Sequence, residues 1–170
     1  MNTQKSDRIV ARYRDRSRKA ARRRFAWNKL VDGRPDDVFP LLCPSREADW
    51  IPGWDAELVF TESGYAEKDC VFRTDPDGTV GPGVWVFTRH DEGKGVELVK
   101  FTPDLLTCLH ITLEEERPDS TRVHWEWVLT GLTDAGNASV EAADAQLEAK
   151  REGIATALDH YLTQGELIPV

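Results

Sequence analysis

Hydrophobic and polar residues alternate along most of the chain between residues 25 and 130. Because successive side chains of a strand point to opposite faces of a sheet, this alternation predicts β-strands. The expected strands span 25–30, 56–61, 69–74, 84–89, 96–102, 105–115 and 121–130, with Gly, Pro and Asp concentrated between them. Short strands separated by turns indicate an antiparallel meander of about seven strands.

The hydrophobic period changes to that of a helix after residue 136. This predicts one helix, which begins at Asn137 or Ser139 and ends at Gln164, with Gly165 as a left-handed terminator. A helix this long needs a concave apolar surface, so we expect an α+β helix-grip fold in which a curved antiparallel sheet holds it. Its apolar stripe consists of Val140, Ala143, Leu147, Ile154, Leu158 and Tyr161.

The last expected hairpin, 105–130, separates its residues into two faces. Its apolar face carries Leu105, Leu109, Ile111 and Leu113 beside Val123, Trp125, Trp127 and Leu129. The opposite face carries His110, Arg122, His124 and Glu126, which form either an acid–base cluster or a solvated cross-strand charge ladder. We favour the ladder, because the apolar face must be the concave one.

Aromatic residues predominate among the positions expected on the concave face. A filled core explains them as well as a ligand pocket does. A pocket is favoured because a bent sheet and a straight helix leave a gap, which small molecules often occupy. The candidate ligand-binding residues are Trp50 and Trp54 at the rim, then Phe72, Arg73, Trp85, Phe87, Phe101, Leu109, Trp125, Trp127, Arg151, Ile154 and Leu158.

Arg151 interrupts the apolar stripe of the helix, between Leu147 and Ile154. A charged residue on a buried stripe needs a partner or a route to water. Arg151 is therefore expected to meet a strand acid, to extend to the rim, or to face a ligand anion. Arg73 and Arg89 are weaker candidates of the same kind.

The net charge of −8 hides a basic N-terminal arm on an acidic body. Residues 1–24 hold ten Lys and Arg against two Asp, and the remaining residues hold 12 basic and 28 acidic ones. The arm either contacts an anionic surface or folds back on the acidic body, and we favour the second interpretation. The expected organisation is an arm at 1–24, a ligand-binding domain at 25–165 and a tail at 166–170.

Sequence motifs for catalysis, metal binding and membrane insertion are missing. No apolar run reaches the roughly 20 residues of a membrane span, and no secretory signal is recognisable, so a cytoplasmic protein is expected. The three cysteines and four histidines have no metal-ligand spacing, and no Gly-rich phosphate loop or nucleophile elbow occurs. We therefore predict no metal and no cofactor, and assign no catalytic residue.

The order of elements resembles the SRPBCC superfamily, which includes START lipid-transfer domains, polyketide cyclases and the birch-pollen-allergen fold. The resemblance covers residues 25–165 and excludes the basic arm. It implies a helix-grip fold with a hydrophobic cavity between sheet and helix, but no shared reaction. The matching pieces are Val-Phe-Pro-Leu-Leu at 38–42, Glu47-x-x-Trp50-x-Pro52-Gly53-Trp54, Val-Phe-Arg-Thr at 71–74, Trp85-Val86 and Gly136-Asn137.

Three functions remain open from the sequence. The first is the binding or carrying of a small hydrophobic or amphipathic molecule in the cavity. The second is a cyclase- or aromatase-like enzyme, in which His110, Arg73, Arg151 and Tyr161 would act if they faced inward. The third is a protein-interaction module with an incidental cavity. The acidic body argues against nucleic acid as a partner, and a homodimer is possible.

Overall fold

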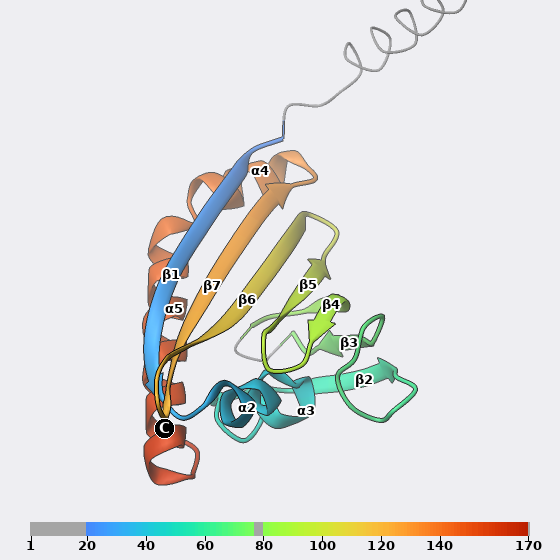
Figure 1. Cartoon of the computed structure of the whole chain (residues 1–170). Coiled ribbons are helices and arrows are strands. Elements are labelled where there is room, and N and C mark those ends of the chain that lie inside the picture. Colours follow the sequence, from blue (N-terminus) through green and yellow to red (C-terminus); the bar gives the residue numbers. More distant parts are fainter. Residues whose placement is uncertain (1–19, 77–79, 170) are drawn as a thin grey trace, which may run out of the picture.

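A computed structural model describes residues 20–76 and 80–169. These residues form one seven-stranded antiparallel sheet that curves along helix α5 (Figure 1). The strand order is β1-β7-β6-β5-β4-β3-β2. The strands are β1 (Arg22–Asp32), β2 (Ala56–Phe60), β3 (Val71–Thr74), β4 (Gly83–Asp91), β5 (Gly95–Phe101), β6 (Leu105–Arg117) and β7 (Ser120–Gly131). The helices are α2 (Pro35–Val38), η1 (Phe39–Leu42), α3 (Pro44–Glu47), α4 (Asp134–Glu141) and α5 (Asp144–Gln164).

The curved antiparallel sheet and the long C-terminal helix confirm the fold class predicted from the sequence. All seven expected strands are present, each within a few residues of its expected bounds. The largest difference is at β1, which begins at Arg22, so that Arg22, Arg23 and Arg24 belong to the sheet. Residues 1–19 of the expected arm lie outside the described residues.

The C-terminal helical segment differs from the prediction because it is two helices. Thr133 caps α4, since its side-chain oxygen accepts a hydrogen bond from the Gly136 amide at 3.1 Å. The expected cap, Asn137, instead accepts a hydrogen bond from the Ala21 amide at 2.9 Å and so joins α4 to the start of β1. Gly165 ends α5 with φ +73°, as expected.

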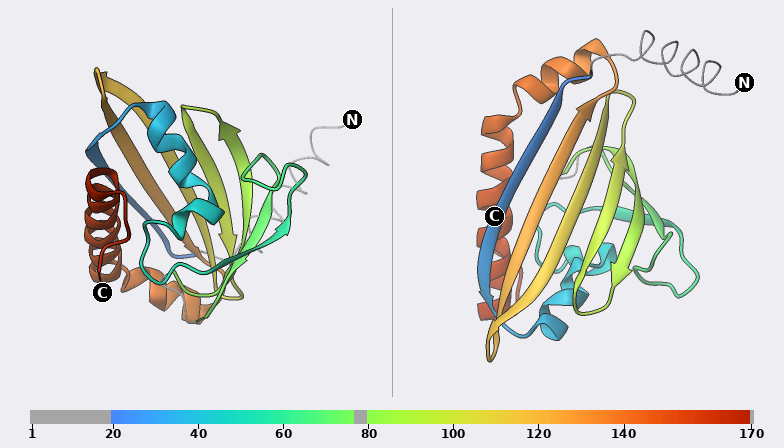
Figure 2. Two further views of the ribbon diagram at one scale, coloured as in Figure 1. Left: turned by 90° about the horizontal axis from the view of Figure 1, so that it is seen from below. Right: turned by 45° about the horizontal axis from the view of Figure 1, so that its top comes forward.

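The short helices α2, η1 and α3 close one end of the inner face, and α4 lies at the other (Figures 1 and 2). We refer to these as the α3 end and the α4 end. At the α3 end the Trp50 indole N–H donates to the Leu41 carbonyl at 2.9 Å, and the Trp54 indole donates to the Pro44 carbonyl at 2.8 Å. Trp50 is 2% exposed, so the expectation that it lies at the rim is wrong.

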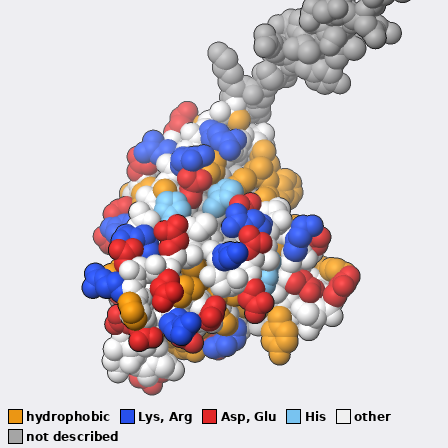
Figure 3. All heavy atoms as spheres, in the orientation of Figure 1, with side chains coloured by type: hydrophobic (Ala, Val, Ile, Leu, Met, Phe, Trp, Pro, Cys, Tyr) orange, Lys and Arg blue, Asp and Glu red, His pale blue; other side chains and the backbone are white. Residues whose placement is uncertain are grey.

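The strand register fixes which side chains share the inner face. Leu109 pairs with Trp127 and Ile111 with Trp125, which confirms the apolar face expected for the β6–β7 hairpin. The outer face carries Glu114 opposite Arg122, and Arg122 donates to Glu116 at 2.9 Å. Basic, acidic and histidine side chains are interspersed on this outer face (Figure 3). The interpretation as a solvated charge ladder is therefore confirmed.

Candidate functional site

Most of the candidate aromatic residues are packed inside the main hydrophobic core. Phe72 and Trp85 stack with ring centroids 5.5 Å apart, and Trp27 stacks on Trp125 at 5.4 Å. Such residues shape an interior, but fully buried ones offer no surface to a ligand. The candidates that are less than 10% exposed are Trp50, Phe72, Trp85, Phe87, Trp125, Trp127 and Leu158.

Three candidates lie away from the inner face. Phe101 is 52% exposed, and it pairs with the exposed Val84 on the outer face of the sheet. The expectation that Phe101 lines the concave face is wrong, because β5 has apolar residues on both of its faces. Arg73 is on the outer face, where it donates to Glu57 at 2.7 Å.

Arg151 also differs from its expected position on the buried stripe. Its side chain is 34% exposed and binds Glu148, one turn away on the same helix, at 2.9 Å. Glu152 lies 3.5 Å from the same guanidinium. The hydrogen bond to Glu148 raises the pKa of Arg151 further. Arg151 is therefore an ion-paired residue of the helix surface.

Burial of the inner face decreases from the α3 end towards the α4 end. Near the α3 end, Val123 is fully buried and Leu113 is 5% exposed. Towards the α4 end, Leu109, Thr107 and Leu129 are only partly buried, although they lie on the central strands β6 and β7. Apolar side chains at the centre of a sheet face keep accessible surface only where the covering layer is incomplete.

Lys100 lies in this partly buried region, which we call the α4-end surface and which consists of Lys100, Thr107, Leu109, Leu129 and Ile154. Its backbone is paired with Trp85 and Thr107, and its ammonium is 5.1 Å from the centroid of the Trp85 ring. The ammonium donates to the carbonyls of Val80 at 2.7 Å and Gly81 at 3.0 Å. Burial, followed by the charge of Lys150, lowers the pKa of Lys100 to about 8.

Gly83 makes room for the Lys100 side chain. A Cβ at position 83 would lie 2.3 Å from Cε of Lys100, which is closer than atoms can approach. Without a side chain at 83, the methylene chain of Lys100 can extend across β4 towards the two loop carbonyls.

Lys150 is a second lysine of interest, and its side chain on helix α5 is exposed. Its charge is the lesser of the two causes that lower the pKa of Lys100, after burial of Lys100 itself. Lys150 has no hydrogen bond or ion pair among the described residues. The two lysines are therefore like charges without a carboxylate partner in the described part of the chain, and Lys100 is partly buried whereas Lys150 is exposed.

Sequence reasoning missed both lysines, although a signal for each was present. Residues 140, 143, 147, 150, 154, 157 and 161 follow alternating steps of three and four, so position 150 lies on the apolar stripe as well as position 151 does. Lys100 follows Val96 and Leu98 at the strand period of two.

Glu47, the first residue of the Glu-x-x-Trp-x-Pro-Gly-Trp segment, is a second titratable group that the sequence did not single out. Its side chain is partly buried and forms no hydrogen bond or ion pair within the described residues. Desolvation raises the pKa of its carboxyl group well above the ordinary value. Glu47 is therefore a carboxyl group that takes up a proton unusually easily.

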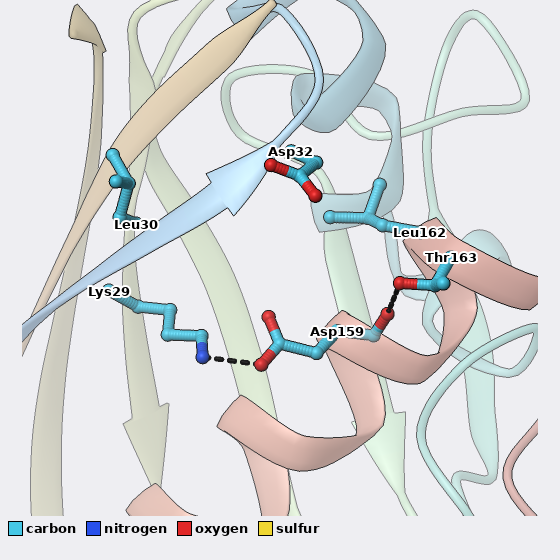
Figure 4. Close-up of a pocket in the computed structure, with 6 residues that line it drawn as sticks. All are labelled: Lys29, Leu30, Asp32, Asp159, Leu162 and Thr163. Carbon is cyan, nitrogen blue, oxygen red and sulfur yellow. Dashed lines mark hydrogen bonds and ion pairs between the residues drawn. The ribbon is translucent and has the colours of Figure 1, made fainter.

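A separate pocket of about 300 Å³ lies between the end of β1 and the last turns of α5 (Figure 4). It is lined by Lys29, Leu30, Asp32, Asp159, Leu162 and Thr163, none of which was a candidate. The Lys29 ammonium binds the Asp159 carboxylate, and Thr163 donates to the Asp159 carbonyl at 2.7 Å. Because its central charges neutralise each other, this pocket is a weaker candidate than the α4-end surface.

No group of three or more His, Cys, Asp or Glu side chains that could hold a metal ion occurs among residues 20–76 and 80–169. Cys43 and Cys70 are buried and Cys108 is partly buried, all as free thiols. Within the same residues, no helix has both the length and the apolar character of a membrane span.

The arrangement of a curved antiparallel sheet around a long C-terminal helix is that of the birch-pollen-allergen fold. Solved structures with this fold include an uncharacterised protein from Rhizobium leguminosarum, with a TM-score of 0.64 and 13% identity over 86% of this chain and 97% of that one. A truncated norcoclaurine synthase from Thalictrum flavum gives a TM-score of 0.64 with 12% identity over 87% and 98%. Ara h 8.0201 gives 0.60 with 15% identity over 84% and 99%.

These structures confirm the helix-grip fold that the resemblance implied. No protein-family model matches the sequence, and no curated protein matches it either. At identities of 12–15% the likeness establishes the fold alone. Function therefore has to be inferred from the side chains of this chain.

Proposed function

We propose that the protein binds a small hydrophobic or amphipathic molecule against the α4-end surface, between the sheet and helix α5. The main support is the decrease in burial along the inner face. Leu109, Leu129 and Ile154 keep accessible apolar surface beside the packed aromatic layer of Trp125 and Trp127. Covering this surface with an apolar ligand is favourable by about 25 cal/mol per Å².

The alternative of an enzyme loses the residues on which it was based. His110 lies on the outer face, 3.7 Å from Glu97, and Arg73 and Arg151 bind surface carboxylates. The Tyr161 hydroxyl is 3.3 Å from the Arg46 guanidinium on α3. The four groups do not converge. A norcoclaurine synthase with this fold has been solved with a transition-state analogue, so catalysis is compatible with the fold.

The interaction-module alternative rests on two groups of exposed apolar side chains. These are Phe101 and Val84 on the outer face, and Val59, Phe60 and Tyr65 on or just after the edge strand β2. Each group is small, and scattered exposed apolar side chains are normal on monomeric proteins. A homodimer stays a prediction, as does the absence of nucleic-acid binding. Ligand binding remains the function with the most support.

A matched pair of threonine substitutions tests the proposal. Thr107→Trp places a large side chain on the α4-end surface, whereas Thr130→Trp places the same side chain on the outer face of the neighbouring strand. Naphthalene-2-carboxamide serves as a neutral apolar probe in titration calorimetry. We expect Thr107→Trp to weaken its binding at least tenfold and Thr130→Trp to leave it unchanged.

Native mass spectrometry of the purified wild-type chain gives an independent readout, since a co-purified ligand adds a defined mass. Circular dichroism checks that both variants remain folded. The proposal is wrong if the carboxamide does not bind the wild-type chain, or if the two variants bind it equally well.

A further inference from the structure

The outer face of the sheet carries an apolar patch on strands β4, β5 and β6. Val84 pairs with Phe101 there, and these two side chains are 44% and 52% exposed. In Figure 3, hydrophobic side chains gather at the upper right, over the end of the sheet where β5 leads into β6. The half-buried neighbours on the same face are apolar too. We call the whole set the outer patch, and it consists of Val84, Val86, Val99, Phe101, Leu106 and Cys108.

The N-terminal segment, residues 1–19, joins the described chain beside this patch. Arg22 at the start of β1 lies on the same row of paired residues as Phe101, with Thr130 and Leu106 between them. Because neighbouring strands are about 4.8 Å apart, the near edge of the outer patch lies roughly 10 Å from Arg22 along the sheet, and its far edge roughly 19 Å. Any occupant of the outer patch therefore has to share this part of the surface with the chain that precedes β1.

The N-terminal segment is long enough to reach across the outer patch. Its apolar residues include Ile9, Val10 and Tyr13, which lie nine to thirteen residues before Arg22. Even at the rise of a helix, which is about 1.5 Å per residue, this length of chain spans roughly 14–20 Å, and an extended chain spans more. These three side chains can therefore reach the exposed pair at the centre of the patch.

Charge favours the same contact. Residues 1–19 hold seven Lys and Arg against two Asp, whereas residues 20–170 hold 15 basic and 28 acidic residues. The segment is therefore attracted to the body of its own molecule. A second copy of the chain would bring a net charge of −8 against an equal charge, so a dimer through the outer patch has less support.

We propose that the N-terminal segment folds back on its own molecule, so that Ile9, Val10 and Tyr13 cover the outer patch. Removal of the apolar surface from water drives this contact. The inference is independent of the proposed function, because the outer patch and the α4-end surface lie on opposite faces of the sheet.

Cys108 is a natural reporter for this contact, because it belongs to the outer patch and is a partly buried free thiol. Its rate of alkylation by iodoacetamide is measured in the full chain by peptide mass spectrometry. The double substitution Ile9→Ser with Val10→Ser removes two apolar contacts, so it should raise this rate about 3- to 10-fold. The buried thiols of Cys43 and Cys70 should stay protected, which shows that the fold is intact.

The matched control is Thr3→Ser with Gln4→Ser, which changes two polar residues of the same segment and should leave the rate at Cys108 unchanged. The proposal is overturned if Ile9→Ser with Val10→Ser is alkylated at the wild-type rate, or if both double variants are alkylated faster. Analytical ultracentrifugation identifies the other occupant. A dimer in which Cys108 becomes better protected as the protein concentration rises assigns the outer patch to a second copy and also overturns the proposal. Protection that occurs in the monomer and does not depend on concentration supports it.

Discussion

Replacing Lys100 by methionine removes a charge from the α4-end surface while keeping an unbranched side chain of similar length over the Trp85 ring. If the ammonium is present to bind a ligand, the free protein holds it at a cost in stability. We therefore expect Lys100→Met to be more stable than the wild-type chain at pH 7, which is the reverse of the usual effect of a substitution at a partly buried position.

The magnitude follows from the pKa of Lys100. A fall from the ordinary value of 10.5 to about 8 corresponds to a cost of about 3.4 kcal/mol for keeping the group protonated in the folded protein. This is an upper limit, because the side chain is only partly buried and water screens its charge. Losing the hydrogen bonds to the Val80 and Gly81 carbonyls offsets part of the gain. We expect a net stabilisation of about 1–2 kcal/mol.

The sign of the pH dependence provides a second check. Between about pH 8 and pH 10.5 the unfolded chain keeps the proton on Lys100, whereas the folded protein releases it. The unfolded state then binds more protons, so the free energy of unfolding of the wild-type chain rises with pH in this range. After burial, repulsion by Lys150 on α5 is the second cause that lowers the pKa of Lys100, and loss of either proton relieves this repulsion. The advantage of Lys100→Met should therefore shrink as the pH approaches about 10.

Urea unfolding followed by tryptophan fluorescence at pH 7 and pH 9.5 measures both effects in the ligand-free protein. Lys94→Met should change the free energy of unfolding by less than about 0.5 kcal/mol at either pH, as expected for an exposed residue. A Lys100→Met variant that is less stable than the wild-type chain at pH 7 would refute the reasoning, because Lys100 would then stabilise the fold through its loop contacts.

Four further substitutions test other parts of the structure by urea unfolding. Gly136→Ala should destabilise the protein by about 2–4 kcal/mol, because the added Cβ would lie 1.9 Å from the Asp104 carbonyl oxygen. Gly153 lies in open space, so Gly153→Ala should stabilise the protein by about 0.5–1 kcal/mol. Similar effects at both sites would contradict this reasoning. Trp50→Phe should lower the free energy of unfolding by about 2–4 kcal/mol, because it removes the buried hydrogen bond to the Leu41 carbonyl and leaves core volume unfilled. A loss below about 1 kcal/mol would contradict this prediction. Arg151→Met should change stability by less than about 0.5 kcal/mol and leave the binding of naphthalene-2-carboxamide intact, because Arg151 pairs with Glu148 on the helix surface. Weakened binding would restore Arg151 as a ligand contact.

The fold could be predicted from the sequence because alternation and turn residues act locally. The β6–β7 hairpin is the clearest case, since Leu109, Ile111, Trp125 and Trp127 can share a face in only one parity of the strand register. The end of α5 was predictable for the same reason, because Gly165 adopts the left-handed conformation that a helix terminator needs. The division into α4 and α5 was not, because it depends on contacts of Gly136 and Asn137 with segments distant in sequence.

The candidate site required the tertiary structure, because its residues occupy positions where local patterns are ambiguous. Strand β5 has apolar residues on both faces, Val96 and Leu98 on one and Val99 and Phe101 on the other. The register in which Lys100 pairs with Trp85 of β4 places Val96 and Leu98 on the inner face. In α5, steps of three and four residues place both Lys150 and Arg151 next to the apolar stripe. The sequence by itself determined which segments become strands and helices and which face of the last hairpin is apolar. Only the tertiary structure decided that Lys100 lies beside Trp85 and the partly buried Leu109 and Leu129, because the energy of a charge depends on neighbours that the linear order does not specify.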